Sequence, residues 1–108
     1  MLTRGDPVDV VQLQGQFATE VDLHALEDGS REASFVVEVE SLPLKGLFLR
    51  VYAREHAAEV VEHEMQHSLL RGRDVALEGW WEDRPSGNDP LKPGDQRPVV
   101  ATRLWFPQ

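Results

Sequence analysis

Residues 47–79 decide the fold, and they read LFLRVYAREHAAEVVEHEMQHSLLRGRDVALEG. Over 47–54, apolar residues alternate with polar or aromatic ones, which predicts a strand with one buried face. Over 54–70 the pattern takes the period of a helix, because one face collects Ala57, Ala58, Val61, Met65 and Leu69. Gly72 follows these residues as a helix C-terminus prefers, and alternation returns over 75–81. The stretch therefore predicts a strand, a helix and a second strand in succession.

Three further strands are expected outside this stretch. The segment 8–17 alternates in its second half, and a turn at 27–30 leads into a second alternating segment at 33–40. A last strand is expected over 99–106. It follows a loop at 84–98 that holds four prolines and two glycines, a composition that cannot support a β-ladder.

The expected order is three strands, a helix and two strands, with no internal repeat. Sandwiches of β-sheets lack such a helix, and doubly wound sheets need several crossover helices. A five-stranded Greek-key barrel of the OB type has this order. We therefore predict a mainly β protein, a single OB-fold domain over 1–108, with one helix between the third and fourth strands.

The composition limits the classes of function. The chain has 108 residues, 41% of them hydrophobic, which excludes global disorder, and it has no cysteine for a disulfide, a thiolate zinc site or a nucleophile. No signal peptide and no apolar run near the ~18 residues of a membrane span occurs, so we expect no membrane partner and a cytoplasmic location. With 11 Lys+Arg against 19 Asp+Glu, the formal net charge is −8. Such a protein repels nucleic acid on average, so binding would require a local cationic surface.

Several stretches resemble the bacterial single-stranded DNA-binding protein family and the related primosomal replication protein B family. The similar segments are 11–15, 29–40, 48–52 and 71–79, in the family's order and spacing. The resemblance implies an OB-fold without enzymatic activity or cofactor that binds single-stranded DNA in replication, restart or repair. It also implies a homodimer or higher homo-oligomer, with replication or repair proteins as further partners.

The third predicted strand carries the strongest candidate binding residues. Phe48, Arg50, Tyr52 and Arg54 alternate with core positions and so share the outward face. Aromatic rings stack on unpaired bases and arginines neutralise phosphates, which is the combination that single-strand binders use. Trp80 is expected on the outward side of the fourth strand. Four cations in flanking loops are further candidates: Lys45, Arg84, Lys92 and Arg97.

Two other interpretations of the same residues remain open. The aromatic rings could pack in a subunit interface while the arginines pair with carboxylates. Glu38 and Glu40 on the neighbouring strand favour a second hypothesis, an OB-fold protein-interaction or assembly module without DNA affinity.

His63, Glu64 and His67 form an HExxH match on the predicted helix, the spacing that zinc hydrolases use. The helical wheel places both histidines opposite the apolar face, and His56 lies seven residues before His63, too far to share its metal. We therefore predict no enzyme and no catalytic metal site, and a small zinc hydrolase at His63, Glu64 and His67 is the third hypothesis, behind the two binding functions. Two histidines four residues apart can still chelate a metal ion at the surface.

Overall fold

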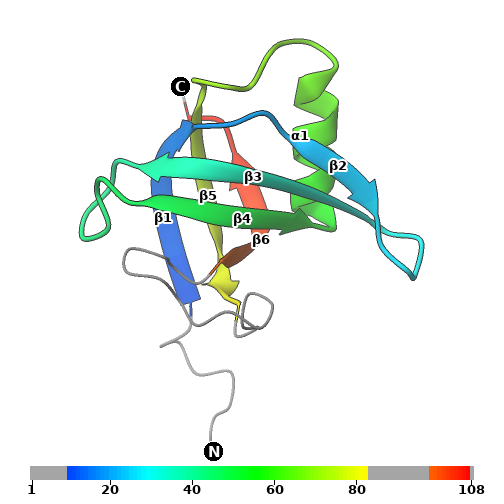
Figure 1. Cartoon of the computed structure of the whole chain (residues 1–108), viewed down its shortest axis with the longest axis horizontal. Helices are drawn as coiled ribbons and strands as arrows, with labels where there is room; N and C mark the ends of the chain where they lie inside the picture. The colour runs from blue at the N-terminus through cyan, green and yellow to red at the C-terminus, as the bar shows by residue number, and fades with distance from the viewer. Residues whose placement is uncertain (1–9, 83–97, 108) are drawn as a thin grey trace, which may run out of the picture.

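The computed structural model describes residues 10–82 and 98–107 and shows six strands and one helix within them (Figure 1). In chain order they are β1 (Val10–Phe17), β2 (Asp22–Ala25), β3 (Arg31–Val39), β4 (Phe48–Arg54), α1 (His56–Met65), β5 (Asp74–Trp81) and β6 (Val99–Trp105). Across the described residues, no helix has both the length and the apolar character needed to cross a membrane.

Five strands close into a barrel. Their order is β1-β5-β6-β4-β3, and β1 also pairs with β3, which closes the circle. The β4–β6 pairing is parallel and the other pairings are antiparallel. In Figure 1, β3 and β4 run side by side across the front, and β1, β5 and β6 stand behind them. The predicted OB-fold, with one helix between the third and fourth barrel strands, is confirmed.

Alternating residues fill the barrel as the sequence pattern predicts. Phe35, Leu49, Val51 and Leu77 are fully buried, and the rings of Phe17 and Phe35 lie 4.7 Å apart between centroids. The helix contributes Ala57 and Val61 to the same core. Side chains of the described residues therefore fill the barrel interior, and we expect a binding surface on its outside.

A tight crossing of β5 and β6 requires a glycine. The register shifts between Glu78 and Gly79, which marks a β-bulge. A Cβ atom built on Gly79 would lie 1.8 Å from the carbonyl oxygen of Val100. Any other residue would force the two strands apart, so this glycine sets the bend of β5.

The helix is shorter than the predicted 54–70, because it ends at Met65 with Gln66 as its C-cap. Leu69 is 83% exposed and Leu70 is 4% exposed, so Leu70 occupies the core position that the helical pattern assigned to Leu69. Gly72 has a φ of +88°, as a left-handed residue should, but it lies in the turn before β5 and does not cap the helix. Its N–H donates a hydrogen bond to the carbonyl of Phe17 at the end of β1. This bond ties the segment after the helix to the barrel, where the periodicity predicts a longer helix.

The strand β2 was not predicted. It has four residues and pairs antiparallel with β3 at the edge of the sheet, with Asp22 opposite Ser34 and His24 opposite Glu32. Four residues hold too few alternations to stand out in a sequence. The strand matters because it widens the outer surface of β3 and β4.

Candidate nucleic-acid interface

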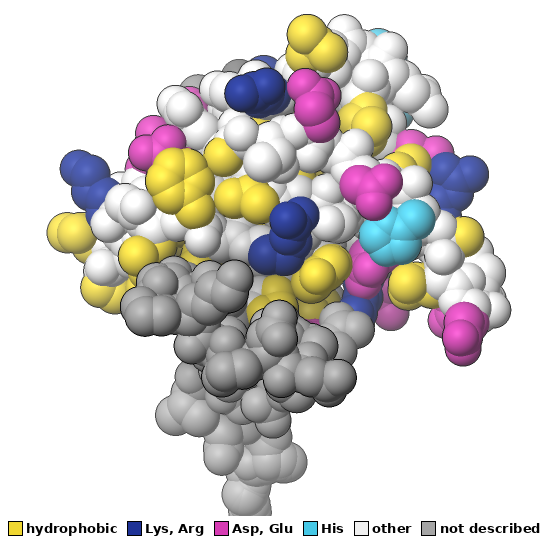
Figure 2. Space-filling model, in the orientation of Figure 1, with side chains coloured by type: hydrophobic (Ala, Val, Ile, Leu, Met, Phe, Trp, Pro, Cys, Tyr) yellow, Lys and Arg dark blue, Asp and Glu magenta, His cyan; other side chains and the backbone are white. Residues whose placement is uncertain are grey.

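The outer surface of β3 and β4 consists of four cross-strand pairs, which we call the β3–β4 face. The pairs are Glu38 with Phe48, Val36 with Arg50, Ser34 with Tyr52, and Glu32 with Arg54. Figure 2 looks onto this surface and shows hydrophobic and cationic side chains beside one another there. Acidic and histidine side chains gather toward β2.

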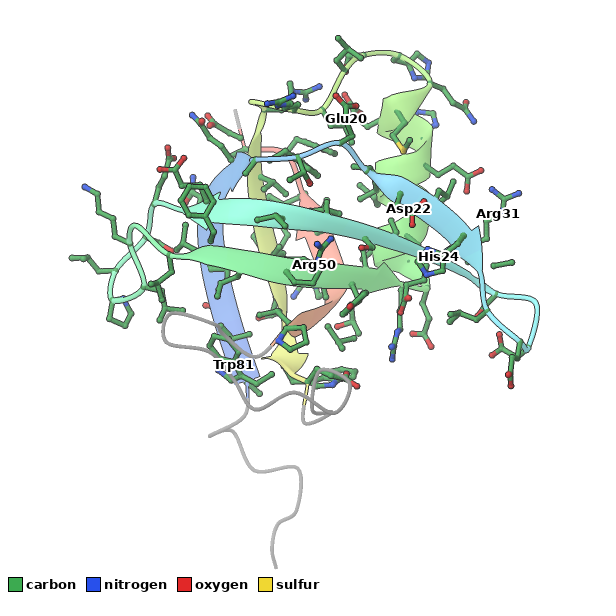
Figure 3. The ribbon with its side chains drawn as sticks, viewed as in Figure 1. Glu20, Asp22, His24, Arg31, Arg50 and Trp81 are labelled. Carbon is green, nitrogen blue, oxygen red and sulfur yellow. The ribbon has the colours of Figure 1, made fainter. Side chains whose placement is uncertain are left out.

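One half of this face carries two aromatic rings with a cation between them. Phe48 is 59% exposed and Tyr52 is half-buried. Arg50, two residues from each, is exposed and lies over the middle of β4 in Figure 3. Its Nη1 donates to the neutral Ser34 hydroxyl at 3.2 Å, and within residues 10–82 and 98–107 it has no carboxylate partner. The predicted row of Phe48, Arg50 and Tyr52 is therefore present on the surface.

Arg54 is on the same face, but it is held in an ion pair. Its Nε donates to Glu32 Oε2 at 2.6 Å, and the Glu32 side chain is only 6% exposed. His24 Nε2 lies 2.8 Å from the other carboxylate oxygen of Glu32. Burial raises the pKa of Glu32, but the hydrogen bonds from Arg54 and His24 outweigh it and hold the pKa below its ordinary value of 4.5. Both arginines lie on the outward face as predicted, but Arg54 is paired with a carboxylate of the described residues and Arg50 is bonded to a hydroxyl.

The strand β2 adds an acidic edge to this half of the face. Asp22 Oδ2 lies 3.5 Å from His24 Nδ1, and both residues stand together on β2 in Figure 3. Sequence reasoning missed both residues because it missed the strand. The short alternation of Asp22 and His24 with apolar neighbours was the signal available. The face is therefore bipolar, with an aromatic and cationic half and an acidic half.

The remaining predicted binding residues lie elsewhere or outside the described residues. Trp80 is 43% exposed, as expected, but it lies on β5 opposite Val10 of β1 and Val100 of β6. Because β6 stands between β5 and β4, Trp80 does not extend the β3–β4 face. Lys45 is exposed in the connection that leads into β4. Arg84, Lys92 and Arg97 fall outside the described residues.

The HExxH residues lie on α1 and the turn after it. His63 and His67 are exposed, as the helical wheel predicted. Glu64 does not join them, because its carboxylate accepts a hydrogen bond from Arg73 Nη1 at 3.1 Å. Over residues 10–82 and 98–107, no three histidine or carboxylate side chains are grouped closely enough to hold a metal ion. Among these described residues, the two histidines have neither a third protein ligand nor an unpaired Glu64 beside them, both of which a zinc hydrolase needs.

No protein-family model and no curated protein sequence matches this chain. Solved structures do match it. A deletion mutant of the single-stranded DNA-binding protein from Thermus aquaticus superposes with a TM-score of 0.65 at 22% identity, over 93% of this chain and 41% of that one. The chain has the fold of a single-stranded DNA-binding protein.

Two further structures agree with this OB-fold assignment and cover most of both chains. The second single-stranded DNA-binding protein from Mycobacterium smegmatis has a TM-score of 0.65 and 18% identity over 91% of this chain and 87% of its own. The dimeric N-terminal domain of PriB protein from Thermoanaerobacter tencongensis has a TM-score of 0.64 and 18% identity, over 94% and 98%. At these sequence identities the similarity concerns the fold alone. Binding by this chain has to be inferred from its own residues.

Proposed function

We propose that this protein binds single-stranded DNA on the β3–β4 face. The observation that carries the proposal is the row along β4 formed by the exposed Phe48 and Arg50 and the half-buried Tyr52. Phe48 and Tyr52 would stack on bases, and Arg50 would neutralise a phosphate between them. The named function of the structural neighbours supports the same ligand class.

The energetic terms predict moderate, salt-sensitive binding. Stacking contributes about 1–3 kcal/mol for each base on an aromatic side chain. The net charge of −8 and the acidic half of the face oppose the approach of a polyanion. Binding therefore relies on stacking and on a small number of cations, and it should weaken as salt screens those cations.

Fluorescence anisotropy of labelled oligo-dT tests the proposal. Phe48→Ala and Arg50→Ala should each weaken binding about tenfold or more, because each removes one contact of the row. Arg103→Ala is the matched control, since it removes an exposed arginine that pairs with Glu78 on the β5–β6 side of the barrel. Absence of binding at low salt with tens of micromolar protein, or equal losses in all three variants, would overturn the proposal.

We further propose that the protein acts in DNA replication, restart or repair in the cytoplasm as a homodimer or higher homo-oligomer. Exposed apolar side chains on the β1, β5 and β6 wall support self-association: Val10, Trp80 and Trp105. A dimeric neighbour of the same fold adds to this support. Sedimentation analysis should show a dimer or larger species that Trp80→Glu dissociates, and a monomer at all concentrations would contradict this part.

A protein-interaction module is the second candidate function. Glu38 lies directly opposite Phe48, so one aromatic ring of the face has an acidic neighbour that repels phosphate. A face of this kind suits a protein partner with basic and apolar residues. Failure of oligo-dT binding together with a retained, Phe48-dependent protein complex would favour this candidate. We propose no enzymatic activity for either form.

A further inference from the structure

The end of α1 and the turn after it bring two histidine rings together on the surface. The ring centroids of His63 and His67 lie 4.8 Å apart with an interplanar angle of 46°, and both side chains are exposed. The backbone keeps a helical path for a few residues beyond Met65. Gln66 keeps right-handed helical angles, and the Ser68 N–H donates to the Glu64 carbonyl at 3.1 Å. His67 therefore stays one helical turn from His63, although the regular helix ends at Met65.

A hydrogen bond fixes the orientation of the second ring. His67 Nδ1 lies 3.0 Å from the backbone carbonyl oxygen of His63. A carbonyl oxygen only accepts, so Nδ1 must carry the proton. In the neutral ring Nε2 then holds a lone pair that no hydrogen bond within the described residues uses. Metal-binding histidines are commonly held in this way, with one ring nitrogen on a backbone carbonyl and the other on the metal.

The first ring is free to rotate toward the same ion. Within the described residues, no hydrogen bond or ion pair engages the His63 ring; its contact is with the His67 ring. Two imidazoles that share a metal place their nitrogens about 2.0–2.1 Å from it, hence within about 4 Å of each other. Ring centroids 4.8 Å apart are close enough for one nitrogen of each ring to reach a shared ion once the His63 ring turns toward it.

We propose that His63 and His67 form a two-histidine site for a divalent transition-metal ion, with water completing the coordination. Imidazole nitrogens suit Cu²⁺, Ni²⁺ and Zn²⁺, and the general order of affinity places Cu²⁺ first. Glu59 is exposed one turn before His63, and the net charge of −8 favours a cation at this surface. Because Glu64 is paired with Arg73, the site binds the ion without a group to activate its water.

Isothermal titration of the untagged full-length protein with CuCl₂ and ZnCl₂ tests this site. We expect one Cu²⁺ per chain, with an electron paramagnetic resonance spectrum that shows two nitrogen ligands and a weaker Zn²⁺ isotherm. His63→Ala and His67→Ala should each lower the Cu²⁺ affinity at least tenfold, since one imidazole cannot chelate.

His56→Ala is the matched control. His56 is exposed on the same helix, and among the described residues its ring lies near Glu59, with Nδ1 3.9 Å from the carboxylate. The affinity of this variant should stay within twofold of the parent protein. An equal loss in all three variants would mean diffuse surface binding, and unchanged affinity in His63→Ala would mean another site; both results overturn the proposal. All three side chains are exposed, so circular dichroism should show unchanged folding.

Discussion

Glu32 determines which cations the β3–β4 face offers to a ligand. Its carboxylate accepts a hydrogen bond from Arg54 on one oxygen and lies within hydrogen-bond distance of His24 on the other. The charge of Arg54 is therefore neutralised within the protein. Arg50 has no carboxylate partner in the part of the chain that the structure describes, because the residue opposite it is Val36 and its hydrogen bond goes to Ser34. Two arginines on one strand face therefore have separate roles, one in stability and one at the surface.

Removing each arginine should separate these roles. Arg54→Ala leaves a buried carboxylate without its charged donor, so the free energy of unfolding should fall by about 1–3 kcal/mol. Arg50→Ala loses one hydrogen bond at an exposed position and should change that free energy by no more than about 0.5 kcal/mol. Urea denaturation of both variants measures the difference. Equal destabilisation by the two substitutions would contradict the assignment.

The lowered pKa of Glu32 predicts a dependence of stability on pH. A carboxylate whose folded-state pKa lies below its unfolded value binds fewer protons in the native state, so it stabilises the fold at higher pH. This stabilisation is complete above the ordinary pKa of 4.5 and is lost as the pH falls through the lower folded-state pKa. The gap in unfolding free energy between the parent and Glu32→Gln should shrink over that acidic window. A gap that widens below pH 4.5 would reverse the sign and refute the prediction.

The sequence predicted which side chains of β4 point outward, because alternation alone determines that. It did not predict their partners. The pairing of Arg54 with Glu32 depends on the register between β3 and β4, and this register depends on the connection between the strands. His24 joined the site through β2, which is too short to be recognised from its pattern.

Among the elements, α1 shows where periodicity stops being a guide. The apolar spacing runs through Met65 to Leu69, but the backbone leaves the helix after Met65 and buries Leu70 instead. The pattern continued past the end of the helix because one more residue at the right spacing is common by chance. The competing interaction, the Gly72 N–H bonded to the carbonyl of Phe17, joins residues far apart in the chain and leaves no local signal.

The leucine pair after the helix tests this register directly. Leu70→Ala removes a core side chain and should lower the free energy of unfolding by about 2–5 kcal/mol. Leu69→Ala removes an exposed one and should change it by no more than about 0.5 kcal/mol. Thermal or urea unfolding of the two variants gives the comparison. A larger loss of unfolding free energy in Leu69→Ala than in Leu70→Ala would contradict this register and support the longer helix that the periodicity predicts.

The protein as a whole combines an acidic surface with a small cationic area. Among the acidic residues, Glu62 pairs with Arg31 and Glu64 pairs with Arg73, both on the side of the helix. Arg50 stands apart from these pairs on the β3–β4 face. The net charge therefore describes the average over the surface. The positive charge of Arg50 can still attract a phosphate locally.

The slope of DNA affinity against salt concentration should report how many phosphates the protein neutralises. For single strands, the logarithm of the binding constant falls with the logarithm of salt concentration by about 0.7 for each phosphate contact. Arg50→Ala should therefore reduce the magnitude of this slope by about 0.7. Phe48→Ala should weaken binding but leave the slope unchanged, because stacking involves no phosphate. Oligo-dT titrations at several salt concentrations measure both slopes. A slope unchanged in Arg50→Ala would show that this arginine touches no phosphate.

The parallel pairing of β6 with β4 also bears on how the chain matures during synthesis. β6 fills the gap between β4 and β5, and Val51 pairs with Val99 across it. A nascent chain that has not yet released residue 99 from the ribosome carries two exposed strand edges, one on each side of that gap. Open edges of this kind recruit chaperones or other chains. β6 therefore covers both of these edges, so neither is left to pair with another chain.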